Sequence, residues 1–181
     1  RALSREVLDA LFTPFPPVYA MLATVLHVPL VIFLIGIVMR GSAFVFRSYG
    51  SRAPHARHRW GVTFAAASIV APLMLGVIIG AISSGATGAA AARVQTASFV
   101  DVYVTPWLAA YPLALGLFAL ALFAFLAAVY LTIEARGGAL QDDFRLRALA
   151  SGVAVFVLAV LAYFLSRTEA PLVATGLSTA P

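Results

Sequence analysis

The sequence contains no cysteine and no lysine, and only 10% of its residues are charged. Without cysteine, the chain by itself cannot form a disulfide, an iron–sulfur cluster, a thiolate zinc site or a covalent c-type haem attachment. Soluble domains carry about 25% charged residues, so the scarcity of charge argues against that class. The net charge of +5 does not indicate a nucleic-acid partner, because the arginines gather at the ends of apolar runs.

Apolar residues make up 62% of the chain and are concentrated in four long runs, at residues 17–39, 61–82, 106–133 and 148–165. Each run has close to the ~20 residues that a helix needs to cross the hydrocarbon core of a bilayer. Because lipid offers no hydrogen-bond partner to the backbone, such spanning segments must be helical. We therefore predict an all-α membrane protein with about four transmembrane helices in a bundle.

The sequence divides into three predicted parts. Residues 1–16 mix charged and apolar residues, which suits an interfacial segment or the remnant of a preceding span. Residues 17–166 form the four-span transmembrane domain, and residues 167–181, rich in Pro, Thr and Ala, are predicted to be a flexible tail. The chain starts with Arg1 and shows no signal-peptide pattern, so we expect it to be part of a longer protein.

The arginines are distributed unevenly between the predicted loops. Residues 40–60 hold five arginines and no acid, and residues 134–147 hold three arginines, whereas Arg93 is alone between the second and third spans. The positive-inside rule then places loops 40–60 and 134–147 in the cytoplasm. Arg40 and Glu134 lie at span ends, where snorkelling or a headgroup contact explains a charge, and Glu134 could pair with Arg40 or Arg136.

The second span carries small residues at every fourth position, namely Ser68, Pro72, Gly76, Gly80 and Ser84. Residues four apart lie on one face of a helix, and small residues on such a face let helix backbones approach closely in lipid. We interpret this face as a helix-packing surface. A second interpretation, that the proline and glycines kink the helix to admit a lipid tail or quinone, stays open.

The ends of the third and fourth spans also carry signals. Thr105, Pro106 and Trp107 suit an N-cap, a proline in the first turn and an aromatic residue at the membrane interface. Asp142 and Asp143 are expected to open the fourth helix, where acids interact favourably with the helix dipole.

Histidine is the only residue type here that could bind a haem through nitrogen, and the chain has three. His27 is the one candidate inside a span, and it has no histidine partner in another span. It is interpreted as a polar residue packed beside Pro29, a proton-path or quinone contact, or a weak candidate cofactor ligand. His55 and His58, among arginines, are expected to be solvated. No pattern of catalytic or metal-binding residues appears.

A resemblance to subunit II of the cytochrome bd-type terminal oxidases is carried by PFPPVYAMLATVLHVPLVIFLIGIVMRGSAFVFR, then Trp60, then FAAASIVAPLMLGVIIGAISSG. That family has an F-P-x-x-Y-A element before a span that ends in R-G-x-A-F-x-F-R. The matching residues here are Phe15, Pro16, Tyr19, Ala20, Arg40, Gly41, Ala43, Phe44, Phe46 and Arg47. The later segments VTPWLAAYPLALGLFALALFAFLAAVYLTIEA and LQDDFRLRAL resemble a following span and loop of the family.

The resemblance implies a complex of the bacterial inner membrane that oxidises quinol and reduces oxygen. Haems b and d and the quinol site would lie in the partner subunit I. This chain would bind no haem directly, would stabilise the haem-bearing helices and could hold a structural quinone or lipid, with no catalytic role by itself. Arg40 and Arg47, with Trp60 and Glu134, would anchor the membrane edge or the contact between subunits.

The chain also departs from that family. Val45 stands where the family has the glutamate of A-F-E-F-R, and an acidic, glycine-rich first span and the final helices are missing. We therefore expect a partial or shortened relative. Two other classes stay open: a small multi-span transporter or permease subunit, suggested by Pro29 and Pro72, and a purely structural membrane protein.

Overall fold

The computed structural model describes residues 25–50, 54–94 and 96–179. Four described helices are long and apolar enough to cross a membrane. They are α3 (His27–Val45), α4 (Pro54–Ser83), α8 (Ala110–Glu134) and α9 (Gly138–Glu169). The predicted class, an all-α membrane protein with four spans, is confirmed. Residues 1–16, and residues 17–24 of the predicted first span, lie outside the described residues.

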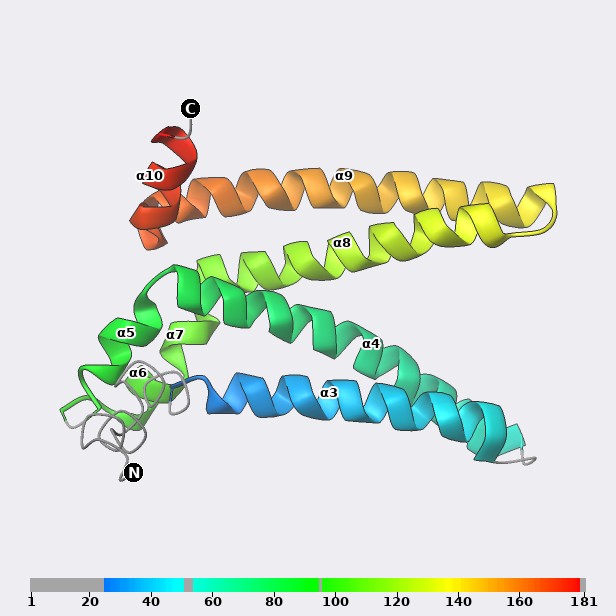
Figure 1. Cartoon of the computed structure of the whole chain (residues 1–181), viewed down its shortest axis with the longest axis horizontal. Coiled ribbons are helices and arrows are strands. Elements are labelled where there is room, and N and C mark those ends of the chain that lie inside the picture. The colour runs from blue at the N-terminus through cyan, green and yellow to red at the C-terminus, as the bar shows by residue number, and fades with distance from the viewer. Residues whose placement is uncertain (1–24, 51–53, 95, 180–181) are drawn as a thin grey trace, which may run out of the picture.

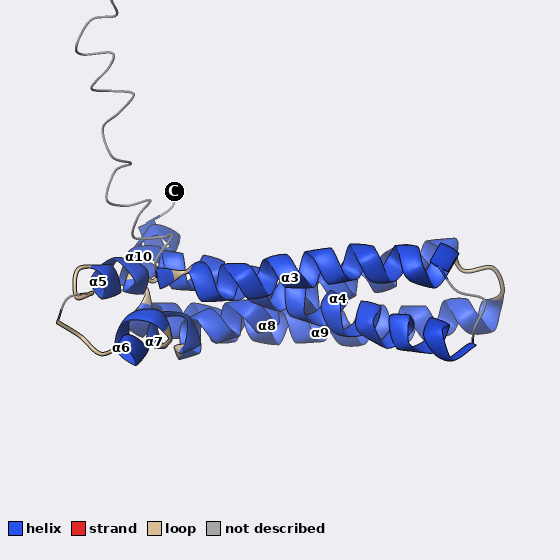
Figure 2. Cartoon of the chain, turned by 90° about the horizontal axis from the view of Figure 1, so that it is seen from below, coloured by secondary structure: helices blue, strands red, loops and turns tan. Residues whose placement is uncertain are grey.

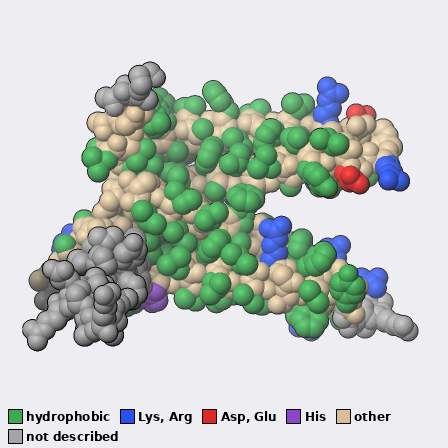
Figure 3. Space-filling view, in the orientation of Figure 1, with side chains coloured by type: hydrophobic (Ala, Val, Ile, Leu, Met, Phe, Trp, Pro, Cys, Tyr) green, Lys and Arg blue, Asp and Glu red, His purple; other side chains and the backbone are tan. Residues whose placement is uncertain are grey.

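The four long helices form two antiparallel hairpins, α3 with α4 and α8 with α9, joined by the contact between α4 and α8 (Figure 1). The same four helices run along the long axis of the molecule in the second view (Figure 2). α4 and α8 lie close together at one end and separate toward the other. The space-filling view shows an open notch between the two hairpins at that other end (Figure 3).

Three short helices lie at the end where α4 and α8 meet: α5 (Ala86–Ala91), α6 (Phe99–Tyr103) and α7 (Thr105–Leu108). A buried apolar cluster joins this end to the long helices, and its members are Leu26, Val77, Ile78, Ala81 and Trp107.

Trp107, predicted to lie at the membrane interface, is buried by the protein itself. Its side chain is only 9% exposed, and its indole Nε1 donates a hydrogen bond to the carbonyl oxygen of Tyr103. The residue is therefore part of the buried cluster, and its position at the membrane interface stays a prediction. The reason lies in the chain path, because Ala109 is extended and separates α7 from α8, which lets α7 turn back over the helix ends. The N-cap of α7 is Val104 and not the predicted Thr105.

Helix ends differ from the hydropathy boundaries. α3 continues past Arg40 to Val45 and then as a π-helix, η1 (Phe46–Gly50). α4 already begins at Pro54 and α9 at Gly138. The basic residues thus lie on helical extensions rather than in irregular loops, because hydropathy reports which residues sit in lipid and not where helical hydrogen bonding stops. Asp142 and Asp143, expected to open the fourth helix, follow its first turn.

Two further features bear on the sequence predictions. α4 is continuous through Pro72, and Pro29 lies in the first turn of α3, where proline is tolerated, so neither marks a helix broken at its midpoint. Residues 167–181 include the last residues of α9 and a further helix, α10 (Pro171–Thr179), which packs against α9. The boundaries of the three predicted parts stay a prediction.

Candidate functional site

The contact between α4 and α8 is built from small residues. A Cβ added to Gly76 would lie 2.7 Å from Cα of Gly116 and 2.8 Å from Cβ of Ala119. A Cβ on Gly80 would lie 2.6 Å from Cα of Pro112. Side-chain atoms do not fit at such distances, so the two helix backbones touch directly here. This close approach explains why α4 and α8 converge at this end and not at the notch.

Ser68 and Pro72 of the small-residue stripe lie on the same helix, whereas Ser84 follows its last residue, Ser83. Pro72 is buried, and the Ser68 hydroxyl donates a 2.7 Å hydrogen bond to the carbonyl oxygen of Phe64, one turn earlier. Pro72 removes one backbone donor from α4, and the serine hydroxyl is satisfied within its own helix. The sequence did not single out Gly36, whose added Cβ would lie 3.3 Å from Cβ of Ala71 where α3 packs on α4. A glycine inside an apolar run was its only signal.

The predicted anchor residues lie on both hairpins, with Glu134 on the α8–α9 hairpin and the other three on the α3–α4 hairpin. On the α3–α4 hairpin, the Arg40 guanidinium carbon lies 5.6 Å from the centre of the Phe64 ring, within the range of a cation–π contact. Close by, the rings of Trp60 and Phe46 stack with their centres 4.7 Å apart. Arg47 is exposed on η1. These contacts tie η1 and the start of α4 together beside the arginines.

Glu134 is the last residue of α8 and is exposed. It makes no ion pair with Arg40 or Arg136 in the described part of the chain, where the one ion pair joins Arg147 to Asp143 at 2.9 Å. Because that pair lies four residues apart on an exposed helix face, it contributes little to stability. Among the described residues, Glu134 therefore lacks the predicted ion-pair partner, and its place at the membrane edge stays a prediction.

The histidines lie at opposite ends of the spans. His27 begins α3 and is exposed, with its ring centre 6.0 Å from that of Tyr103. His55 and His58 lie in the first turns of α4, past the far end of α3 from His27. The 19 residues of α3 between them span about 28 Å along the helix axis. His55 and His58 share one helix, so they cannot approach a haem from opposite faces.

These positions do not fit a haem with two histidine ligands from this chain. The described residues also contain no group of three or more His, Asp or Glu side chains that could hold a metal ion. The packing and anchoring roles expected for Ser68, Pro72, Gly76, Gly80, Arg40, Arg47, Trp60 and Glu134 stay predictions.

One polar contact was missed from the sequence. The carboxylate oxygen Oε2 of Glu169, at the end of α9, accepts a 2.8 Å hydrogen bond from the backbone N–H of Tyr111 at the start of α8. The Tyr111 hydroxyl in turn accepts a 3.4 Å hydrogen bond from Ser83 at the end of α4. Three helix ends thus meet at one residue, 4% exposed. The sign of this contact in the sequence was an acidic residue, Glu169, just past the predicted fourth span.

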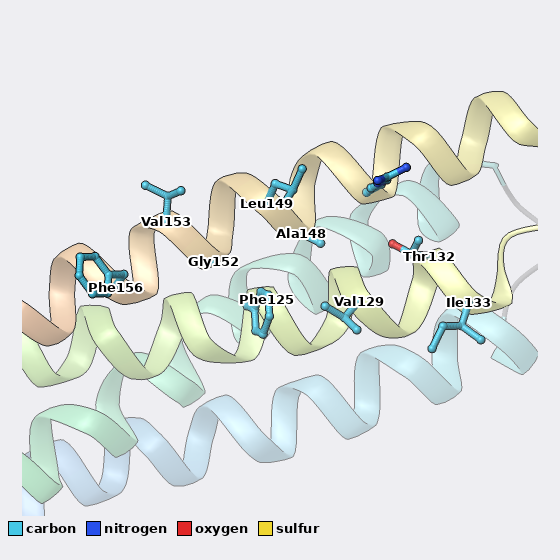
Figure 4. Close-up of a pocket in the computed structure, with 10 residues that line it drawn as sticks. Phe125, Val129, Thr132, Ile133, Ala148, Leu149, Gly152, Val153 and Phe156 are labelled. Atoms are coloured by element: carbon cyan, nitrogen blue, oxygen red, sulfur yellow. The ribbon is translucent and has the colours of Figure 1, made fainter.

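A groove of about 570 Å³ runs between α8 and α9 (Figure 4). Its lining is almost wholly apolar, with Phe125, Val129 and Ile133 from α8 and Leu149, Val153 and Phe156 from α9. The polar residues that line it are Thr132 and Arg145, both at the end nearest the α8–α9 loop.

The family model described as cytochrome bd terminal oxidase subunit II matches residues 7–180. No curated protein and no solved structure matches the chain.

Proposed function

Because the chain belongs to the family of cytochrome bd terminal oxidase subunit II, we propose that it is the subunit that carries no haem and stabilises the haem-bearing subunit I. Membership in the family makes it an integral membrane component of a quinol oxidase that takes part in electron transport. The observation that carries the proposal is the match over residues 7–180, which runs through all four spans.

The placement of the histidines supports an accessory role. Electrons from quinol have to reach oxygen through haems, and a haem inside the membrane needs axial ligands that face it. His27 lies at one end of the spans, and His55 and His58 lie together on α4 at the other end. The haems b and d, and with them the redox steps, are therefore assigned to subunit I, with this chain as its scaffold and as a possible holder of structural quinone or lipid.

The shape of the chain supports a partner in the membrane. The window of α9 that would cross the bilayer has none of its residues buried inside the described chain, and that of α8 only 17%. The notch between the hairpins leaves further surface of both uncovered, with apolar and charged side chains along its edges (Figure 3). Apolar helix surface that the chain's own helices leave uncovered is available to a neighbouring subunit, which fits a component of a hetero-oligomer.

The arrangement of charge supports an orientation in the bacterial inner membrane. The ends of both hairpins that carry loops 40–60 and 134–147 lie on the same side of the molecule (Figure 1). These loops hold most of the arginines in the printed sequence. The positive-inside rule puts this side in the cytoplasm, and the end with α5, α6 and α7 outside.

The proposal is tested by isolating the chain from native membranes with an affinity tag and recording a reduced-minus-oxidised absorption spectrum. Bands of haems b and d, together with a larger co-purifying subunit, are the expected result. A mock purification from membranes without the tagged chain is the control. A haem-free preparation that still contains the folded chain would overturn the proposal and favour the transporter or structural alternatives.

A further inference from the structure

We propose that the groove between α8 and α9 binds one anionic phospholipid, with an acyl chain along its apolar walls and the phosphate at Arg145. This inference depends only on the chain spanning a membrane, and it stands or falls separately from the oxidase function. The groove volume of about 570 Å³ lies in the range of small-ligand sites, ~300–1,000 Å³.

The length of the groove along α9 matches the thickness of one leaflet of a bilayer. Its residues on α9 run from Arg145 to Phe156, which is about 16 Å along a helix axis. One leaflet contributes about half of the ~30 Å hydrocarbon core. Arg145 lies just before the apolar stretch of α9, so the groove begins at the membrane edge and ends near the bilayer centre. An acyl chain that enters from the headgroup region would follow this path.

The groove is closed on one side by an aromatic ring. The Phe125 ring lies against the backbone of α9 at Gly152, where an added Cβ would be 3.3 Å from ring carbon Cε2. The ring fills the space between the two helices, and Val129 and Ile133 continue the wall from there toward the loop. The result is a shallow apolar channel along the helix pair (Figure 4). No polar side chain is present in it that would recognise a quinone head group at the deep end.

The positive charge of Arg145, at the loop end of the groove, favours a ligand that carries a phosphate. Arg145 is exposed and makes no ion pair in the part of the chain that the structure describes, whereas the neighbouring Arg147 is engaged by Asp143 at 2.9 Å. Thr132, the other polar residue of the groove, adds a hydroxyl at the same end, where it now donates to the carbonyl oxygen of Ala128. A guanidinium binds a phosphate through strong, charge-assisted hydrogen bonds, whereas an uncharged quinone ring offers it no anionic group.

The test uses the full protein as isolated from membranes, with the subunits that accompany it. The sample is stripped of lipid in mild detergent, and native mass spectrometry follows its binding of added phosphatidylglycerol and of phosphatidylcholine. We expect phosphatidylglycerol to be retained about fivefold more strongly, the effect of one arginine near a membrane surface. Arg145→Gln removes this preference, and Arg145→Lys keeps it.

Matched variants locate the lipid. Arg147→Gln, which removes an arginine already paired with Asp143, leaves the preference unchanged. Val153→Trp fills the groove and lowers retention of both lipids, whereas Leu146→Trp, exposed on the same helix outside the groove, does not. An unchanged preference in Arg145→Gln overturns the proposal, and so does a Val153→Trp variant that loses bound quinone but keeps phosphatidylglycerol. Retention of phosphatidylglycerol by a haem-free preparation would refute the oxidase role and leave this site standing.

Discussion

At the scale of single residues, Glu169 is the side chain that links parts of the chain far apart in sequence. Its carboxylate accepts a hydrogen bond from the backbone N–H of Tyr111, in the first turn of α8. The N–H groups of a first helical turn have no partner within the helix, and an acid there also interacts favourably with the helix dipole. Glu169 therefore acts as an N-cap supplied from another helix.

Glu169→Ala is expected to lower the free energy of unfolding by about 1 kcal/mol, the usual effect of losing such a cap. Glu169→Gln keeps an acceptor oxygen and is expected to lose less. The measurement is thermal unfolding of the purified protein in detergent, with Thr168→Ala, an exposed neighbour, as the control. Equal melting temperatures for Glu169→Ala and the control would show that the contact adds nothing to stability.

At the scale of secondary-structure elements, the crossing of α4 and α8 depends on the absence of side chains. Gly76 and Gly80 on α4 meet Gly116 and Pro112 on α8 at distances too short for an added Cβ. Away from these residues the two helices separate, and the notch opens between the hairpins (Figure 3). The role of this stripe as a packing surface remains our proposal, and a substitution on it gives the test.

Gly76→Leu is expected to push α4 and α8 apart and to destabilise the protein by at least about 1–3 kcal/mol, the usual cost of overpacking. Gly61→Leu is the control on the same helix, because an added Cβ there has no atom within 4 Å. The control is expected to be neutral or slightly stabilising, since leucine favours helix more than glycine does. Unchanged thermal stability of Gly76→Leu in detergent would mean that this face does not hold the helices together.

At the scale of the whole molecule, the arginine-bearing ends of the two hairpins lie on one side and the short helices α5, α6 and α7 lie on the other (Figure 1). Arg40 and Arg47 belong to the arginine-bearing side and are exposed there. An exposed arginine at a membrane edge can bind a lipid phosphate or an acid of a neighbouring subunit. We propose that these two residues anchor the chain in its complex.

Arg40→Ala and Arg47→Ala are each expected to reduce the yield of assembled complex severalfold, about the effect of one such charge at a membrane surface. Arg93→Ala, which removes the arginine between the second and third spans, is the control and is expected to leave the yield unchanged. The yield is measured by affinity purification followed by size-exclusion chromatography. Equal recovery of the three variants would remove the anchoring role.

The sequence by itself determined that this protein lies in a membrane, that it has four apolar spans, and which family it belongs to. Hydropathy summed over about 20 residues decides whether a segment lies in lipid, and in lipid a spanning segment has to be a helix. The motif around Arg40 and Phe46 is local as well, so the family could be predicted from it, and the match over residues 7–180 confirms that prediction. None of these conclusions requires knowing which segments touch.

Only the tertiary structure decided which residues meet. The burial of Trp107, the cap from Glu169 to α8, the contact of Gly76 with Gly116 and the groove beside Arg145 each join segments that are distant in sequence. The helix ends also had to come from the structure. Arg40 lies within α3, whereas the apolar run in the sequence stops just before it. The physical reason is that burial and hydrogen bonding between helices depend on their mutual placement, which a pattern along one helix does not specify.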